Sequence, residues 1–238
     1  MNEQRNPGTP YLPTASVGRY GTGFILAGGQ SSRMGTDKSL APFNGTPLIQ
    51  NALQTLAAAG LGAQIAGSRS PLGQFAEEIP DIYPESGPLG GIHAALSASP
   101  AAWNVFLPVD LPLMPSSLLV CLFERAMVTD APVTICKLNG RLQPFPVILN
   151  RSVLPLLAQR LQSCQTACHA AWQSIPPALQ SDLDSVAVEY LVQCGQCAHP
   201  LDLPPVFWFQ SANTPAELAW LNQRSANVMR SAANSQVS

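Results

Sequence analysis

Charged side chains are scarce in this sequence. Only 11% of its 238 residues are Asp, Glu, Lys or Arg, and the formal net charge is −2. A protein that binds nucleic acid over a broad surface needs a basic stripe, so we expect no nucleic-acid partner. The hydrophobic share of 46% is that of a globular protein rather than a disordered one. A small, locally basic pocket is compatible with this balance.

Long apolar runs are also missing. No stretch approaches the roughly 18 apolar residues of a membrane-spanning helix, and residues 1–20 have no apolar segment of signal-peptide length. We therefore expect no membrane partner. The chain has six cysteines and no recognisable secretion signal, which indicates reduced thiols and a cytoplasmic location.

Histidine is rare as well, and the patterns of two common catalytic groups are absent. The three histidines are scattered, with no HExxH and no arrangement typical of a Ser/His/Asp triad. Two sets have the residue types of a zinc site, namely Cys164-xxx-Cys168-His169 and Cys194-xx-Cys197-x-His199. The first spacing is irregular for zinc, so buried or loop thiols are the favoured interpretation.

What the sequence does contain is a glycine-rich loop after a short apolar segment. The run from Gly23 to Lys38 reads GFILAGGQSSRMGTDK, with Arg33 and Lys38 as its cations. Glycines allow backbone N–H groups to approach phosphate oxygens, and the two cations neutralise charge. Neither GxxxxGK[ST] nor GxGxxG is present, so this is a phosphate loop of another kind. An ordinary strand-to-helix turn is the alternative interpretation.

Strands and helices alternate through the first 130 residues. This order predicts a single-domain, three-layer α/β/α fold with a mostly parallel sheet and a ligand crevice at the carboxyl ends of its strands. We expect one domain over 21–222, between flexible tails at 1–20 and 223–238. The periodicity predicts strands at 22–27, 63–66, 104–109, 131–138, 145–149 and 206–209. Asn139-Gly140 predicts a hairpin between the strands at 131–138 and 145–149. We expect helices capped by Thr46, Ser116 and the capping box Thr214-x-x-Glu217, the last of them ending near Leu221.

A lone carboxylate, Asp110, follows the strand predicted at 104–109. With the loop at a neighbouring strand end, it suggests a phosphate site bridged by Mg²⁺, which proteins bind through one or two carboxylates plus phosphates and water. Arg33 and Lys38 would stabilise charge on a phosphoryl group under attack. The pattern therefore favours phosphoryl or nucleotidyl transfer. A turn cap is the alternative role for Asp110.

Beyond these inferences, five blocks resemble a known family. LAGGxSxRMGxDK (26–38) is similar to the signature of the nucleotidyltransferase superfamily with a glycosyltransferase-A-like, Rossmann-like fold. Within it, the likeness is to molybdenum cofactor guanylyltransferases, the MobA family. The other four blocks are Pro80-Asp81 with GPLGGI (87–92), PVDLPLMP (108–115), GRLQP (140–144) with the Asn150-Arg151 segment, and NTPxEL (213–218). The region 162–205 is unmatched.

The resemblance implies transfer of GMP from Mg²⁺-GTP to the terminal phosphate of molybdenum-bound molybdopterin, with release of pyrophosphate. Its implied substrate-binding residues are Leu26, Ala27, Gly28, Gly29, Lys38, Asp81, Gly87 and Asp110. Its implied catalytic residues are Arg33, Lys38 and Asp110, with Asp110 on the metal. Partners would be GTP, molybdopterin, and a molybdoenzyme or chaperone that receives the finished cofactor.

Three departures from the family pattern affect these implications. An asparagine after the second strand is replaced within Ala66-Gly67-Ser68, the histidine of an HP pair is Gln143, and an arginine-rich segment reads SCQTAC (163–168). Gly29 favours a purine, because relatives that use CTP typically have Ala-Ala-Gly there. Transfer from CTP, transfer to another phosphate acceptor, and a non-catalytic nucleotide-binding role remain alternatives.

Overall fold

The computed structural model describes residues 20–28, 37–67 and 72–235. The expected N-terminal tail, apart from Tyr20, and the loop segment 29–36 lie outside these residues. Within the described part, none of the helices combines the length and the apolar character that crossing a lipid bilayer requires.

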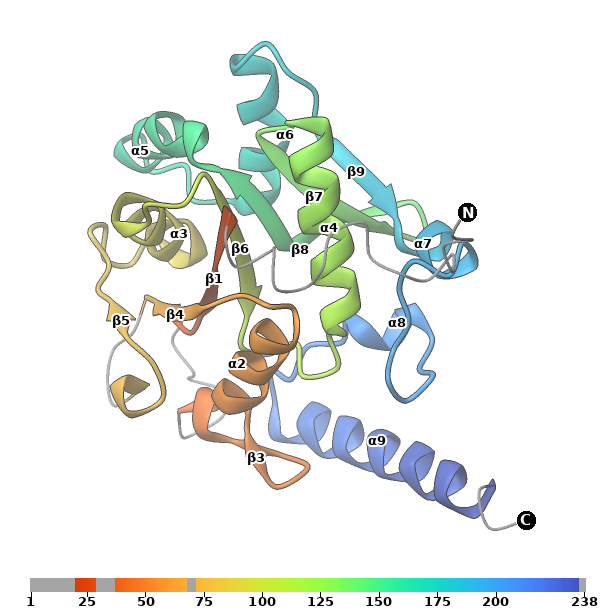
Figure 1. Ribbon diagram of the computed structural model, residues 1–238. Helices are drawn as coiled ribbons and strands as arrows, with labels where there is room; N and C mark the ends of the chain where they lie inside the picture. The colour runs from red at the N-terminus through yellow and green to blue at the C-terminus, as the bar shows by residue number, and fades with distance from the viewer. Residues whose placement is uncertain (1–19, 29–36, 68–71, 236–238) are drawn as a thin grey trace.

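A seven-stranded sheet forms the middle layer, in the order β5-β4-β1-β6-β8-β7-β9 (Figure 1). Every neighbouring pair is parallel except the two that β8 makes with β6 and β7. The predicted fold, an α/β protein with a mostly parallel sheet, is confirmed. The strands are β1 (Gly21–Leu26), β4 (Ala63–Ala66), β5 (Glu78–Ile79), β6 (Trp103–Pro108), β7 (Val133–Leu138), β8 (Arg141–Asn150) and β9 (Asp184–Ala187).

Helices cover both faces of this sheet. One apolar core lies under α2 (Leu48–Ala58) and α4 (Ser116–Thr129), and the other under α3 (Gly87–Ala98), α5 (Leu154–Gln162) and α6 (Cys168–Ala178). Strand β1 alternates between them, with Ile25 in the first core and Phe24 and Leu26 in the second. Burying a side chain of this size stabilises the fold by about 1.5–3 kcal/mol.

Two glycines of β1 allow the helices of the first core to approach the sheet closely. A Cβ at Gly21 would overlap the ring of Phe123 in α4, and one at Gly23 would lie 3.0 Å from Leu56 in α2. Larger residues there would force these helices away from β1. The glycines therefore allow α2 and α4 to pack closely on β1.

The Asn139-Gly140 hairpin between β7 and β8 forms as predicted. Both residues have positive φ, +50° and +74°, as a tight two-residue turn requires. The return strand is longer than the expected 145–149, because it pairs with β7 from Arg141 onward. At the far edge, the carboxylate of Asp184 in β9 accepts two hydrogen bonds from Arg125 Nε, at 2.8 and 2.9 Å, and anchors the last strand to α4.

Several predictions for local structure were wrong. The strand expected at 206–209 is a helix, α8 (Pro205–Trp208), because prolines fix its first turn and Trp208 Nε1 donates to Leu203 O at 2.7 Å. Thr46 is no helix cap but pairs with Phe43 in the small hairpin of β2 (Pro42–Phe43) and β3 (Thr46–Pro47). Ser116 is the first residue of α4, whose N-cap is Pro115.

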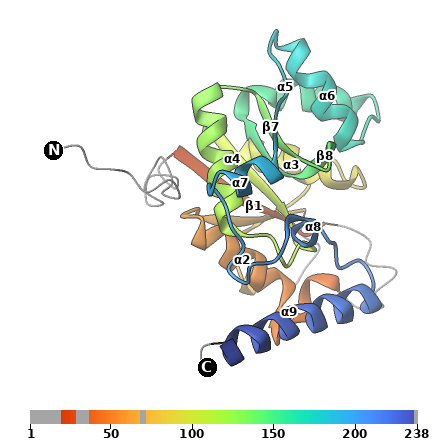
Figure 2. The same cartoon turned by 90° about the vertical axis from the view of Figure 1, so that its right-hand side faces the viewer.

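The final helix, α9 (Pro215–Ser235), begins at the predicted capping box but does not end near Leu221. It continues past Leu221, where Asn222 and Ser225 contact the β2–β3 hairpin, and Figure 2 shows α9 beneath α2. Asn44 N donates to Asn222 Oδ1 at 2.6 Å, and Asn44 Nδ2 donates to Ser225 Oγ at 2.9 Å. The expected domain end at 222 therefore falls inside a helix.

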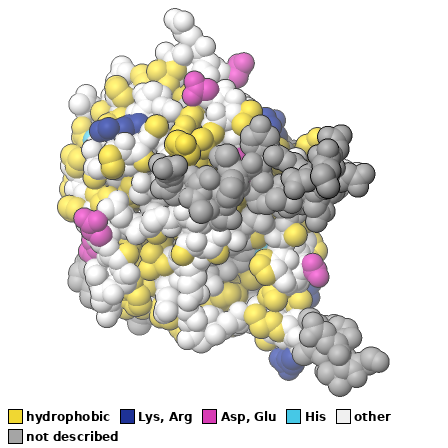
Figure 3. All heavy atoms as spheres, viewed as in Figure 1, with side chains coloured by type: hydrophobic (Ala, Val, Ile, Leu, Met, Phe, Trp, Pro, Cys, Tyr) yellow, Lys and Arg dark blue, Asp and Glu magenta, His cyan; other side chains and the backbone are white. Residues whose placement is uncertain are grey.

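Charged side chains are few and scattered on the face shown in Figure 3, among hydrophobic and uncharged polar ones. The remaining elements are α7 (Val188–Gln193) and the 3₁₀ turns Lys38–Leu40, Leu72–Gln74 and Arg151–Val153.

Candidate active site

The carboxyl ends of β1 and β6 bring two predicted site segments together. Leu26 O accepts a hydrogen bond from Val109 N at 3.2 Å, and Ala27 N donates to Ala66 O at 3.2 Å. Leu26, Ala27 and Asp110 therefore lie at one edge of the sheet, where parallel α/β proteins bind their ligands.

Lys38 contacts Asp110 at this edge. Its ammonium nitrogen lies 2.8 Å from Asp110 Oδ2 and 3.0 Å from Asn213 Oδ1. The Lys38 and Asp110 side chains are 19% and 18% exposed, so solvent screens the pair only partly. One cation and two oxygen acceptors thus converge from three distant parts of the chain.

Local backbone structure fixes each member of this group. The side chain of Asp37 accepts from Ser39 N at 2.9 Å and starts the 3₁₀ turn that carries Lys38. Asp110 follows β6, and its backbone oxygen accepts from Ala212 N at 2.9 Å. That bond ties the segment before α9 to the end of β6.

Asn213 was missing from the site residues inferred from the sequence. The capping box of α9 holds it: Glu217 Oε2 accepts from Asn213 N and Thr214 N, both at 2.9 Å, and Glu217 N donates to Thr214 Oγ1 at 3.2 Å. Asn213 Nδ2 donates to Ser211 Oγ at 2.7 Å, which leaves Oδ1 facing Lys38. Only the NTPxEL block pointed to this residue.

A second group of residues lies on the neighbouring strand ends. A Cβ at Gly28 would lie 2.6 Å from Gly67 O, so the backbones that follow β1 and β4 almost touch. Cβ atoms at Gly67 and Gly91 would lie 3.3 and 3.5 Å from Asp81 Oδ1. The Asp81 carboxylate therefore faces Gly67 and Gly91, one strand away from the Lys38 group. Gly67, at φ +77°, belongs to the Ala66-Gly67-Ser68 run, within which the family pattern would have an asparagine.

The glycines that open α3 have different roles. A Cβ at Gly90 would lie 2.7 Å from Tyr83 O, so this glycine permits close packing, whereas a Cβ at Gly87 would meet nothing within 4 Å. The ring of His93, deeper in α3, meets that of Tyr83 edge-on at 5.0 Å. Burial lowers the pKa of His93. Gly87 is thus exposed at the helix start, while Gly90 and His93 fix the loop that carries Asp81.

Two predicted site residues, Gly29 and Arg33, lie outside the described residues. Gln143, at the position of the family's histidine, donates to Arg141 O at 3.3 Å.

The alternative zinc site finds no support in the structure. Within the described residues no three His, Cys, Asp or Glu side chains lie together as metal ligands would. All six cysteines are described and free, as expected for reduced thiols. Burial raises the pKa of Cys121 to about 11 and that of Cys197 to about 12, so both thiols are protonated at neutral pH.

Comparison with known proteins places this geometry in a family. A family model described as "MobA-like NTP transferase domain" matches residues 23–175. The chain belongs to the MobA-like NTP transferase family. It is an α/β nucleotidyltransferase, as predicted from its motifs.

Relatives of this NTP transferase carry a consistent name. This chain is 41% identical over 138 residues to a "Molybdenum cofactor guanylyltransferase" of Vibrio cholerae. The alignment covers 56% of this chain and 68% of the relative. The chain is 31% identical over 207 residues to a "Probable molybdenum cofactor guanylyltransferase" of Deinococcus radiodurans, covering 85% and 94%. The second alignment is long enough to include much of the region after residue 175.

Solved structures agree on the fold. The transferase superposes with a TM-score of 0.69 on molybdopterin-guanine dinucleotide biosynthesis protein A of Archaeoglobus fulgidus, at 19% identity, over 87% of this chain and 99% of that chain. MobA-family nucleotidyltransferases generally use a divalent metal ion.

Proposed function

We propose that this enzyme transfers GMP from GTP to the terminal phosphate of molybdenum-bound molybdopterin, with Mg²⁺, and releases pyrophosphate. The observation that carries the proposal is the convergence of Lys38, Asp110 and Asn213 at the ligand-binding edge of the sheet. The names of the relatives supply the substrates. A cytoplasmic location accompanies the proposal, since free cysteines are typical of reducing compartments.

The residues at this edge fit a hard divalent cation. Asp110 Oδ2 and Asn213 Oδ1 both point at the Lys38 ammonium, and oxygen donors of this kind are those that Mg²⁺ prefers. A single carboxylate suffices for Mg²⁺ when phosphates and water complete its shell. When bound there, the ion would neutralise charge on the reacting phosphates and on the pyrophosphate leaving group.

In this proposal the Lys38 side chain occupies two positions in turn. Before substrate arrives, the Lys38 ammonium lies 2.8 Å from Asp110 Oδ2 and holds that carboxylate in place. When GTP enters, its three N–H donors can turn to phosphate oxygens, where positive charge stabilises the transition state most. Asn213 keeps the ammonium at the edge during this exchange. Arg33, on the same loop, is proposed as the second cation.

Asp81 is proposed to select the nucleotide. A carboxylate accepts hydrogen bonds but cannot donate them, and guanine carries two adjacent donors, N1–H and the 2-amino group. Gly28 and Gly67 lie close together beside Asp81 and carry no side chains, which supports access of a base to this carboxylate. Leu26, Ala27, Gly29 and Gly87 are proposed to line the same nucleotide.

Pyrophosphate release from purified enzyme, molybdopterin and Mg²⁺ tests the proposal, with GTP, CTP and ATP in parallel reactions. We expect release with GTP, dependent on acceptor and abolished by EDTA. Turnover with CTP alone would move the protein to the cytidylyl-transferring enzymes. Tight GTP binding without release, at any acceptor concentration, would leave it a nucleotide-binding protein. Transfer of the product to a molybdoenzyme or chaperone stays a prediction.

A further inference from the structure

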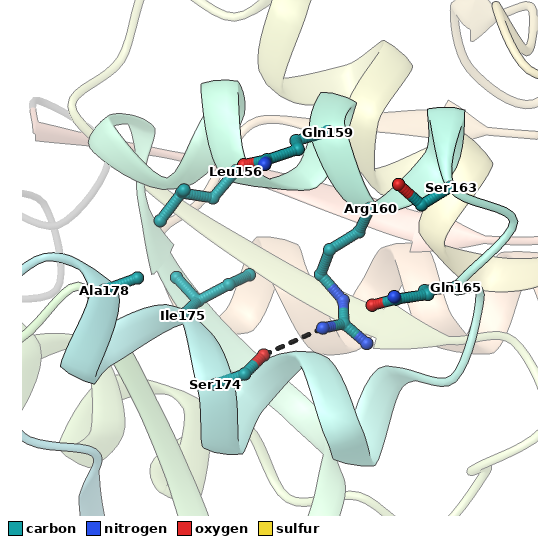
Figure 4. Close-up of a pocket in the computed structure, with 8 residues that line it drawn as sticks. All are labelled: Leu156, Gln159, Arg160, Ser163, Gln165, Ser174, Ile175 and Ala178. Atoms are coloured by element: carbon teal, nitrogen blue, oxygen red, sulfur yellow. Dashed lines mark hydrogen bonds between the residues drawn. The ribbon is translucent and has the colours of Figure 1, made fainter.

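A groove of about 240 Å³ lies between α5 and α6, on the sheet face opposite to α2 and α4 (Figure 4). None of its lining residues belongs to the Lys38 or Asp81 group. One end is apolar, formed by Leu156, Ile175 and Ala178, and the other is polar, formed by Gln159, Arg160, Ser163, Gln165 and Ser174. Arg160 is the single charged residue in this lining.

The guanidinium of Arg160 is held in place but not saturated. Its Nη1 donates to Ser174 Oγ at 2.9 Å, and Ser174 Oγ in turn donates to Ala171 O at 3.3 Å. Its Nε is buried, and no acceptor in the described part of the chain reaches it. In a guanidinium, Nε–H and one Nη2–H point the same way, so the bond to Ser174 uses the other edge. A buried donor without a partner costs about 1–3 kcal/mol, which calls for an acceptor.

The α5–loop–α6 backbone closes the polar end of the groove, and Figure 4 shows the unpaired edge of the Arg160 guanidinium turned toward Gln165. Gln165 N and Ser163 N both donate to Arg160 O, at 2.9 and 3.1 Å, and close the chain around the end of α5. Figure 4 shows the Arg160 side chain reaching from α5 toward α6, with Gln165 beside it and Leu156 and Ile175 at the far end. Gln165 is exposed, so its side chain can move aside for a ligand at low cost.

We propose that this groove binds a small carboxylate that carries a short apolar group. The carboxylate would take the two parallel N–H donors of Arg160, the geometry that a guanidinium fork matches best. The apolar group would lie against Leu156, Ile175 and Ala178. A single positive charge suits a carboxylate better than a phosphate monoester, which carries −1.5 to −2 at neutral pH. The groove is smaller than the roughly 300–1,000 Å³ of typical ligand pockets, so a nucleotide is too large for it.

Titration calorimetry with the full-length protein tests this proposal, using butyrate as the probe. Butyramide, which has the same shape without the charge, and inorganic phosphate are the parallel ligands. We expect butyrate to bind at least about tenfold more tightly than either, since one charge-assisted pair supplies that factor. Equal affinity for butyrate and butyramide would overturn the assignment, and preference for phosphate would replace the carboxylate with another anion and overturn it too.

Three variants and one control locate the binding. Arg160→Gln should weaken the affinity for butyrate about tenfold or more. Arg160→Lys keeps the charge but loses the two parallel donors, so it should retain only part of the wild-type affinity. Ala178→Leu should reduce the length of the carboxylate that the groove accepts, so that acetate binds as well as butyrate. Arg151→Gln removes an exposed arginine outside the groove and should change nothing. Wild-type affinity in both Arg160 variants, with native circular dichroism, would reject the site.

A competition experiment separates this groove from the transfer site. Saturating Mg²⁺-GTP and molybdopterin should leave the affinity for butyrate unchanged, because the lining shares no residue with the Lys38 group. Displacement by either substrate would make the groove part of the transfer site and would refute a separate carboxylate site. Because the titration needs no turnover, its result does not depend on the proposed guanylyl transfer.

Discussion

The ammonium of Lys38 lies 3.0 Å from the amide oxygen of Asn213, a residue 175 positions further along the chain. The contact joins the turn after the glycine-rich loop to the start of the last helix, and both meet Asp110 at the end of β6. The candidate catalytic group is therefore complete only when the C-terminal segment is folded against the sheet.

Removing the positive charge of Lys38 should reduce turnover strongly. Lys38→Met should lower kcat by about 10²–10³, the loss expected when one preorganised electrostatic donor to a transition state is removed. Steady-state pyrophosphate release with GTP measures it. Lys137→Met, the same change at the other lysine of the sequence, is the control and should retain wild-type kcat. A wild-type rate in Lys38→Met would exclude Lys38 from catalysis.

Asp110→Asn keeps the shape of the side chain and removes its charge. We expect loss of turnover together with weaker binding of Mn²⁺, measured by electron paramagnetic resonance on the protein with GTP, because an amide is a poorer ligand for a hard cation. Asp130→Asn, at an exposed position on the C-cap of α4, is the matched control. If Mn²⁺ affinity is unchanged in Asp110→Asn, the carboxylate has no metal role.

The capping box should affect catalysis as well as stability. Glu217→Ala removes the acceptor of Asn213 N and Thr214 N and should cost about 1 kcal/mol of stability, as loss of an N-cap does. Because the same bonds orient Asn213, kcat should also be several-fold lower than in the wild type. The rate is measured below 25 °C, where the variant is still folded. Glu217→Gln keeps an acceptor oxygen and should retain most of the stability and most of the kcat of the wild type. Reduced stability with an unchanged kcat would limit Glu217 to a structural role.

The carboxylate of Asp81 should discriminate between purines. Asp81→Asn should raise the KM for GTP about tenfold or more, the effect of losing one charge-assisted hydrogen bond. It should also reduce the preference for GTP over ITP, which lacks the 2-amino group. The comparison of kcat/KM for the two nucleotides measures this, with exposed Asp182→Asn as control. An unchanged GTP/ITP ratio would place Asp81 away from the base.

The sequence predicted those parts of the fold that depend on local patterns. Alternating apolar segments gave the strands that meet at the site, and Asn139-Gly140 gave the hairpin. The segment 206–209 looked like a strand because Val206, Phe207 and Trp208 favour sheets, but its flanking prolines and the bond from Trp208 to Leu203 make it helical.

Long-range contacts could not be predicted in this way. The part of α9 beyond Leu221 is polar and lacks a strong helical signal, and Asn222 at its start accepts a hydrogen bond from Asn44 in a hairpin 178 residues earlier. Asn213 looked like part of a helix cap, and only the folded chain places its amide against Lys38. The orphaned Nε of Arg160 likewise arises from the packing of α5 on α6 and has no trace in the sequence.

Stability should fall as the pH decreases from 7 to 5, because two histidines are buried. Burial lowers the pKa of His93 and of His199 below 6.5, so the unfolded chain binds protons more readily than the folded one. The free energy of unfolding is then fully retained above about pH 6.5 and decreases below it. Urea denaturation at pH 5, 6, 7 and 8 measures the change.

Two variants test the role of His93 in this pH dependence. His93→Phe keeps a ring against Tyr83 and should flatten the pH dependence of stability, whereas His169→Phe, at an exposed position, should leave it as in the wild type. A wild-type pH dependence in His93→Phe would show that protonation of His93 does not limit stability in this range.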